Sequence, residues 1–277
     1  MTAMARLMLL LLLVWADVTG GDVQKRIIGG QTCGRTERLY HVRLTAVQPL
    51  NSTHDMVENC GGSLISDQWI LTAAHCWPAG RTMHATVGVH PGPGEDFQIT
   101  RQEVYSDTNG RHDIMLLQLP QRPQMQIQPI ELPDCAGCVT KLLSKLSCCG
   151  KCVTSKPSLG KTVQVAGHAA TVAGAANLRV PTQVPDLHCA YLNVVGCQGV
   201  LSPVDPNIIW RPQYYFCGQS PNQDICLGDS GGGVVYLNQI YGVISFTGDG
   251  HYACSRAAGF MDVCEYKPWI QTITGIP

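Results

Sequence analysis

The sequence predicts an all-β protein, a barrel or a sandwich, built from two β units and ending in a short helix. Short apolar runs rich in Val, Ile and Leu alternate with clusters of Gly, Pro, Asn and Asp; the clearest runs are residues 63–73, 114–119, 163–165 and 234–245. After the first 20 residues there is no internal repeat and almost no helical periodicity. A Pro-rich stretch, residues 119–133, separates two groups of runs, so we expect it to join the two units.

The composition limits the classes of function. The 277 residues are 45% hydrophobic and 14% charged, which suffices for a sizeable core and fits one large domain or two small ones. The formal net charge is -1, and no run is rich in Lys or Arg. The sequence therefore does not predict binding to nucleic acid or to another polyanion.

The N-terminal segment predicts secretion. Arg6 precedes an apolar run from Leu7 to Trp15, which is shorter than the roughly 20 residues that a membrane-spanning helix needs. A cleaved signal peptide over residues 1–20 is the preferred interpretation, with cleavage after Ala16 or Gly20, and a membrane anchor is the alternative. We expect a secreted, extracellular protein without a stable membrane anchor.

Two further features fit an oxidising compartment. The chain has 14 cysteines, which in a secreted protein predict disulfides rather than thiol chemistry. Asn51, Ser52 and Thr53 form a glycosylation sequon, so Asn51 is a candidate for an attached glycan.

The C-terminal helix is expected over residues 265–274. Gly275 is placed to end it. Pro268 is compatible with this helix only if it falls in the first turn, where its missing N–H costs nothing.

Three residues stand where they could carry acyl-transfer chemistry. His75 follows an apolar run, Asp113 begins another, and Ser230 lies in a glycine-rich turn. A nucleophile, a general base and a carboxylate that orients the base are what such a triad needs. Taken singly, each has a simpler interpretation, as a surface histidine, a turn aspartate and a turn serine.

Four motifs together resemble the trypsin/chymotrypsin family of serine endopeptidases. They are RIIGG at residues 26–30, LTAAHC at 71–76, DIMLLQL at 113–119 and GDSGG at 228–232. The similarity runs from Ile27 to about Ile270. It implies two packed six-stranded antiparallel β-barrels within a peptidase domain over residues 27–277, with barrels at about 27–133 and 134–264 and the helix at about 265–274.

The resemblance also implies the catalytic roles. Ser230 is the nucleophile of an acyl-enzyme mechanism, His75 the base and acid, and Asp113 the residue that orients His75. The N–H groups of Gly228 and Ser230 would stabilise the oxyanion. Protein or peptide substrates and protein protease inhibitors are the partners expected of this family.

An activation step follows from the same resemblance. Cleavage after Arg26 by an activating protease would free the amine of Ile27, which would pair with Asp229, because a buried carboxylate is costly without a partner. Residues 21–26 would be the activation peptide, and they hold no cysteine that could keep them attached.

Asp224 is expected at the floor of the primary specificity pocket, where it would select Arg or Lys through a charge-assisted hydrogen bond. The pocket residues expected by resemblance are Ile225, Ser245, Phe246, Thr247 and Gly259. Several depart from the family pattern. Ile225 narrows the pocket, and Gly248 or Gly250 would have to replace a missing glycine.

Arg256 could pair with Asp224 and close the pocket to basic substrates, so an aromatic or aliphatic preference stays open. Departures at His168, Ala169 and Gly233 lie near segments that order on activation. The alternative function is therefore a catalytically weak or inactive homologue that acts as a binding protein.

The family pattern implies a set of disulfides. Cys264 would pair with Cys135 or Cys138. The other expected pairs are Cys33–Cys189, Cys60–Cys76, Cys197–Cys217 and Cys226–Cys254.

A cysteine-rich insertion follows Pro133. Two local disulfides are preferred there over zinc, although the connectivity is open and the spacing would allow four thiolate ligands. The cysteines concerned are Cys135, Cys138, Cys148, Cys149 and Cys152. Glu95 and Asp96 alone are too few for calcium, which needs six or more oxygen ligands. We predict no metal and no cofactor.

Overall fold

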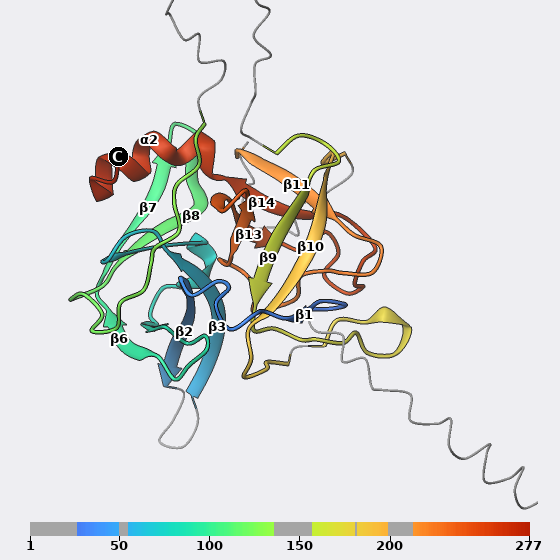
Figure 1. The fold of residues 1–277 in the computed structure, drawn as a ribbon, viewed down its shortest axis with the longest axis horizontal. Helices are drawn as coiled ribbons and strands as arrows, with labels where there is room; N and C mark the ends of the chain where they lie inside the picture. Colours follow the sequence, from blue (N-terminus) through green and yellow to red (C-terminus); the bar gives the residue numbers. More distant parts are fainter. Residues whose placement is uncertain (1–26, 50–54, 136–156, 181, 199–212) are drawn as a thin grey trace, which may run out of the picture.

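The computed structural model describes residues 27–49, 55–135, 157–180, 182–198 and 213–277. They form two antiparallel sheets side by side and one C-terminal helix (Figure 1). The predicted signal and activation peptides lie outside the described residues. So do Arg26, Asn51, Cys138, Cys148, Cys149 and Cys152.

The first sheet is a half-barrel of seven strands in the order β6-β5-β2-β3-β4-β8-β7. Every pairing in it is antiparallel. Its strands are β2 (His41–Pro49), β3 (Asp55–Leu64), β4 (Trp69–Thr72), β5 (Thr82–Val87), β6 (Glu95–Ile99), β7 (Arg101–Asp107) and β8 (Gly110–Gln118).

The second sheet closes on itself. Its order is β1-β10-β11-β14-β13-β12-β9, and a further β10–β9 pairing joins six of the strands into a barrel. The all-β prediction with two barrel-like units is confirmed. The strands are β1 (Gln31–Thr32), β9 (Thr162–Gly167), β10 (His188–Val195), β11 (Tyr215–Gln219), β12 (Gly233–Tyr236), β13 (Gln239–Phe246) and β14 (Ala258–Asp262).

Strand β1 differs from expectation. We placed residues from 27 onward in the first barrel, whereas β1 pairs with β10 of the second sheet, with Gln31 opposite Cys189. The Cys33–Cys189 disulfide fixes this pairing. The start of the chain is thereby held beside the sheet that carries Ser230.

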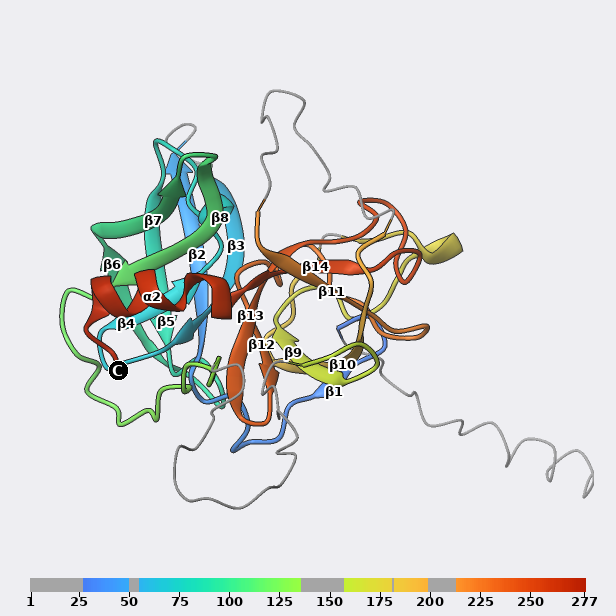
Figure 2. The same ribbon diagram turned by 90° about the horizontal axis from the view of Figure 1, so that it is seen from above.

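Side-chain alternation explains where the core lies. In β2, Val42, Leu44 and Ala46 are buried while Arg43 and Thr45 are half-buried, as expected for a strand with one face on the core. The larger core cluster continues into the second sheet and includes Val235, Ile240, Val243 and Met261 of β12, β13 and β14. The two sheets therefore share part of one apolar core, and their contact is visible from above (Figure 2).

Helix α2 spans Val263–Thr274 and returns to the first sheet near β7 and β8 (Figures 1 and 2). The Asp262 carboxylate accepts from the Cys264 N–H at its start, and Gly275 ends it with φ 73°. Our expectation for Pro268 was wrong, because the helix begins two residues earlier and puts Pro268 beyond the first turn. Burial of Val263, Tyr266 and Ile270 offsets the lost hydrogen bond.

The disulfides agree with most of the expected pairs. Three of the four appear as expected, namely Cys33–Cys189, Cys60–Cys76 and Cys197–Cys217, and Cys264 pairs with Cys135. The expected Cys226–Cys254 pair is not formed, and both thiols are free. The Cys226 thiol instead faces the Val180 carbonyl at 3.9 Å.

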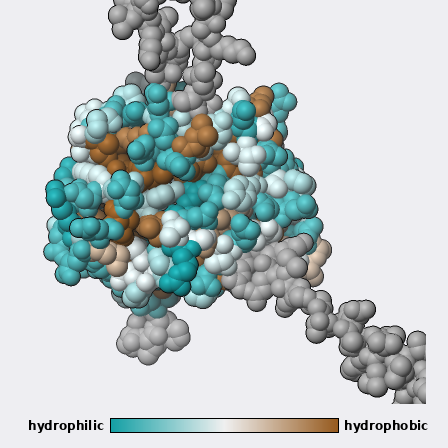
Figure 3. All heavy atoms as spheres, in the orientation of Figure 1, coloured by the Kyte–Doolittle hydropathy of each residue, from teal (hydrophilic) through white to brown (hydrophobic). Residues whose placement is uncertain are grey.

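The surface is mixed. On the face shown in Figure 3, hydrophilic residues cover most of the area and apolar residues gather in a few patches. Among the described residues, no helix has the length and apolar character needed to cross a membrane.

The Tyr266 hydroxyl gives a test of how α2 is attached. It lies 2.8 Å from His112 Nδ1 on β8 and accepts from the Tyr214 N–H at 3.2 Å, fully buried. We expect Tyr266→Phe to lower the free energy of unfolding by about 1–3 kcal/mol, because buried polar partners lose their hydrogen bonds. Urea unfolding measures this. Tyr215→Phe, at a tyrosine that is 37% exposed, is the control, and an equal loss in both variants would contradict the assignment.

Candidate active site

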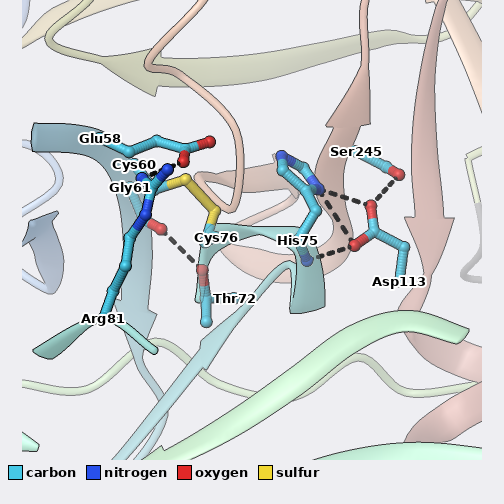
Figure 4. Close-up of a disulfide and its surroundings, with 9 residues drawn as sticks. All are labelled: Glu58, Cys60, Gly61, Thr72, His75, Cys76, Arg81, Asp113 and Ser245. Carbon is cyan, nitrogen blue, oxygen red and sulfur yellow. Dashed lines mark hydrogen bonds and ion pairs between the residues drawn. A yellow bond between two sulfur atoms is a disulfide. The ribbon is translucent and has the colours of Figure 1, made fainter. Parts of the chain in front are cut away.

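His75 and Asp113 form the best-defined contact in the site (Figure 4). The His75 Nδ1 atom lies 3.0 Å from Asp113 Oδ1 and 2.9 Å from Oδ2, and the His75 backbone N–H donates to Oδ1 at 2.9 Å. A carboxylate accepts only, so Nδ1 carries the proton on this side. The Nε2 atom is left to act as a base.

Asp113 is itself held from two further directions. Ser245 of β13 donates its hydroxyl to Asp113 Oδ2, and the Asp113 N–H donates to Gln213 Oε1 at 2.8 Å. The aspartate is 9% exposed. Since Ser245 comes from the second sheet, the hydrogen bond crosses between the two sheets and fixes the orientation of the carboxylate.

His75 owes its position to a short rigid segment. It lies on the 3-10 turn η1 (Ala74–Cys76), which follows β4, and the Cys60–Cys76 disulfide ties that turn to β3 (Figure 4). Among the described residues, Cys60, Cys76 and His75 also bring potential metal-ligand atoms together. This group is not a metal site, because its two sulfur atoms are bonded to each other.

The environment raises the pKa of His75. Burial by itself would lower it, but the Asp113 charge and hydrogen bond outweigh burial, and Glu58 adds a smaller effect in the same direction. Its side chain remains 40% exposed. The imidazole therefore faces solvent on one side and a fixed negative charge on the other.

Ser230 lies in the turn before β12 and reaches the same cavity as His75 and Asp113. The cavity has a volume of about 690 Å³, and all three residues line it. The next residue, Gly231, has φ 79°, and a Cβ there would lie 2.1 Å from Thr72 Oγ1, so the turn requires glycine. The structure thus brings the three predicted catalytic residues to one hollow between the sheets.

The N–H groups of Gly228 and Ser230 are candidates for binding an oxyanion. Neither donates to an acceptor in the described part of the chain, while the Ser230 carbonyl accepts from the Gly61 N–H at 2.7 Å. Gly228 has φ 106°. Unused donors beside a nucleophile are what oxyanion binding needs.

Asp229 is completely buried and accepts two hydrogen bonds. Its Oδ1 accepts from the Ala169 N–H at 3.0 Å and its Oδ2 from the Cys226 N–H at 2.8 Å. A Cβ on Gly167 would lie 1.9 Å from Asp229 Oδ1, so only glycine fits there. Burial raises the pKa of Asp229 to about 6.

The segment after Arg26 lies against the chain that leads to Ser230. The Asp224 N–H donates to the Ile28 carbonyl at 2.9 Å, and Gln223 Nε2 donates to the Gly29 carbonyl at 3.1 Å. Ile27 is completely buried in a cluster that includes Ile225. This places the start of the predicted mature chain beside the active-site turn.

The expected pocket residues divide into two groups. Ile225, Ser245, Phe246 and Thr247 line the cavity, whereas Asp224 and Gly259 do not. The Phe246 ring covers Gly259, since a Cβ there would lie 2.0 Å from the ring. The expected places of Asp224 and Gly259 in the specificity pocket therefore stay predictions.

The two candidates for the missing glycine, Gly248 and Gly250, differ in the space around them. A Cβ on Gly248 would lie 2.1 Å from the Ala257 carbonyl oxygen, and one on Gly250 would meet nothing within 4 Å. Gly248 therefore makes a close backbone approach to Ala257, and the choice between the two glycines for the pocket stays a prediction.

Asp224 is paired with an arginine that the sequence reasoning missed. Its Oδ2 accepts from Arg179 Nη2 and from the Cys254 N–H at 2.8 Å, and its Oδ1 accepts from the Ile225 N–H at 2.9 Å. We considered Arg256 for this place, and the structure provides Arg179. Burial raises the pKa of Asp224, and Arg179 offsets part of that effect.

The missed residues carried weak signals. Arg179 stands in a stretch rich in Ala, Gly and Val, where an isolated arginine is unusual, but no local pattern names its partner 45 residues away. Gln213 follows a tryptophan, an arginine and a proline and resembles an ordinary loop residue. Their partners follow only from the tertiary structure.

Comparisons with known proteins establish the family. A sequence profile described as Trypsin matches residues 27–270. The chain therefore belongs to the trypsin family of serine proteases.

Individual relatives cover most of the chain. Trypsin-4 of Rattus norvegicus is 30% identical over 89% of this chain and 89% of its own length. Trypsin of Pleuronectes platessa is 28% identical over 96% and 97%. The thrombin-like enzyme elegaxobin-1 of Protobothrops elegans is 28% identical over 89% and 95%.

The effect of Asp113 on His75 can be measured directly. We expect Asp113→Asn to lower the pKa of the His75 imidazole, because the charge and hydrogen bond that raise it are lost while burial remains. NMR titration of the histidine ring protons provides the measurement. Asp107→Asn, which faces His112 at 3.2 Å, is the matched control. An unchanged His75 titration in the Asp113→Asn protein would refute the assignment.

Proposed function

We propose that the protein is a secreted serine endopeptidase, made as a zymogen, that hydrolyses peptide bonds through an acyl-enzyme. The observation that supports this most is the pair of His75–Asp113 hydrogen bonds beside a cavity that Ser230 also lines. Nucleophile, base and orienting carboxylate are the minimum set for acyl transfer.

Each group has a defined part in the proposed reaction. Ser230 Oγ attacks the substrate carbonyl carbon while His75 Nε2 takes its proton, and the new oxyanion is bound by the N–H groups of Gly228 and Ser230. The C–N bond then breaks, and His75 gives the proton to the leaving amine. Water, deprotonated by His75, hydrolyses the Ser230 ester. Asp113 stabilises the imidazolium that forms twice in this cycle.

Activation by cleavage after Arg26 is the second part of the proposal. The new Ile27 ammonium would supply the partner that the buried Asp229 carboxylate lacks. The close contact of residues 28–29 with residues 223–224 supports this, because it holds the start of the mature chain beside the segment that leads to Asp229. An activating protease is then a required partner.

Secretion is supported by the N-terminal apolar run and by the four disulfides among the described residues. Protein substrates and protein inhibitors are the partners that the trypsin family implies. A glycan at Asn51 belongs to the same proposal, since the sequon can be used only in the secretory pathway.

The choice of substrate residue is a separate question. Asp224 would select Arg or Lys only where its carboxylate is available to the substrate, and Arg179 holds it. The same observation favours the alternative function, a catalytically weak or inactive binding protein. Turnover distinguishes the two.

Labelling of Ser230 tests the endopeptidase proposal without assuming a specificity. We expect a fluorophosphonate probe to label the protein after cleavage at Arg26, and Ser230→Ala to abolish both labelling and casein hydrolysis, because the attacking oxygen is absent. Mass spectrometry of the labelled peptide identifies the residue. Ser66→Ala is the control, as it lies away from the cavity. Equal residual hydrolysis in the Ser230→Ala protein would point to the binding-protein function.

Activation should make stability depend on pH in a defined way. The pKa of Asp229 is raised to about 6 from its usual 3.8. Between these pH values the folded, uncleaved chain binds more protons than the unfolded chain, so its free energy of unfolding falls as pH rises through this range. Pairing with the Ile27 ammonium offsets the loss. We expect the gain in Tm on cleavage to be larger at pH 7.5 than at pH 4.5.

Calorimetry of Ser230→Ala protein before and after cleavage measures this gain without self-digestion. Asp229→Asn is the control and should remove the pH dependence. A gain of the same size at both pH values would exclude the proposed pairing.

A further inference from the structure

Arg179 is paired with Asp224, the residue that the family resemblance places at the floor of the specificity pocket. Its side chain is 1% exposed and that of Asp224 is 4% exposed. All three guanidinium nitrogens are used: Nη2 donates to Asp224 Oδ2, Nη1 to the Ile225 carbonyl, and Nε to the Asp249 carbonyl at 2.8 Å. The guanidinium group is planar and its donors have a fixed arrangement, which suits a buried site with several acceptors.

The backbone around Arg179 holds the side chain in place. The Arg179 N–H donates to the His251 carbonyl at 2.8 Å, and the Ala253 N–H donates to the Asn177 carbonyl at 2.9 Å. Leu178 forms an antiparallel bridge with Tyr252. The backbone at Arg179 is therefore fixed by contacts with residues 251–253.

A substrate arginine could pair with Asp224 only by replacing Arg179. Asp224 Oδ1 already accepts from Ile225 and Oδ2 from both Cys254 and Arg179. An entering guanidinium would displace Arg179 and gain one ion pair while another is lost, and the displaced charge would have to leave a buried position. Without displacement, the entering cation would meet a pair with no net charge.

The cavity beside Ser230 has several uncharged side chains in its lining, together with His75, Arg111 and Asp113. Ile225, Leu227, Phe246 and Thr247 line it, and the Phe246 ring lies against Gly259. Such a surface binds an uncharged side chain by excluding water. Charge and shape thus favour the same class of substrate residue.

We infer that Arg179 is a specificity-determining residue: it occupies Asp224 in place of a substrate's basic side chain and leaves a pocket for an uncharged, apolar residue before the scissile bond. This inference rests on the proposed hydrolysis by Ser230.

Peptide substrates that differ only in the residue before the scissile bond test the wild-type protein after cleavage at Arg26. With Leu or Phe at that position, we expect kcat/KM to exceed that with Arg or Lys by about tenfold or more, the scale on which a single pocket discriminates. A preference for Arg or Lys in the wild-type protein would overturn the inference while leaving the proposed hydrolysis intact.

The variant Arg179→Ala is expected to gain activity. Release of Asp224 should raise kcat/KM for the Arg substrate by about tenfold or more and change that for Leu much less. Adding Asp224→Asn should abolish the gain. Arg256→Ala, which removes one positive charge two residues from Cys254, is the matched control for a general charge effect. An equal gain in Arg256→Ala would overturn the inference.

A binding measurement tests Arg179 without turnover. Methylguanidinium has the headgroup that Arg179→Ala removes, so in a Ser230→Ala background it should raise Tm by about 2 °C or more in Arg179→Ala and not in protein that keeps Arg179. Equal ionic strength of sodium chloride is the control. An equal rise in both proteins, or none in a variant that circular dichroism shows to be folded, would overturn the inference.

Failure of the proposed hydrolysis and failure of the inference about Arg179 would give different results. Absence of peptide hydrolysis and of Ser230 labelling, together with methylguanidinium binding only to the Arg179→Ala form, would reject the endopeptidase and support the occupied pocket. If Arg179→Ala does not fold, Arg179→Gln keeps part of the hydrogen bonding without the charge and takes its place in both measurements.

Discussion

The contact between the two sheets is the constraint on which the site depends. His75 and Asp113 come from the first sheet, and Ser230 and Ser245 come from the second. Two hydrogen bonds cross this contact beside the catalytic groups: Ser245 donates to Asp113, and Gly61 donates to the Ser230 carbonyl. Because packed cores deform little, the shared apolar cluster keeps the two sheets, and with them these side chains, in a fixed relative position.

Three buried aspartates, Asp113, Asp224 and Asp229, differ in the groups that surround their carboxylates. Asp113 is oriented by a serine, a glutamine and the histidine it supports. Asp229 has two backbone N–H donors, and burial raises its pKa to about 6. Asp224 has a full guanidinium partner. The partners of these carboxylates are thus a histidine ring for Asp113, two backbone N–H groups for Asp229 and a guanidinium group for Asp224.

Membership of the trypsin family does not by itself identify the substrate residue that the pocket would accept. The chain shares the Trypsin profile over residues 27–270, and His75, Asp113 and Ser230 line one cavity. The pocket, however, depends on side chains that the shared motifs do not include, above all Arg179 and Phe246. The free cysteines Cys226 and Cys254 neighbour the same ion pair: the Cys254 N–H donates to Asp224, and Cys226 follows Ile225, whose carbonyl accepts from Arg179. Specificity therefore has to be argued from this chain's own contacts.

The sequence by itself determined the all-β class, the helix ended by Gly275 and the three candidate catalytic residues, because each depends on short-range pattern or on motifs a few residues long. It also determined most cysteine pairs through family resemblance. The tertiary structure alone decided that β1 joins the second sheet, that Pro268 lies beyond the first turn, and that Arg179 reaches Asp224. Those outcomes depend on contacts between segments far apart in the chain or on competing packing energies. Neither can be inferred from a short stretch of sequence.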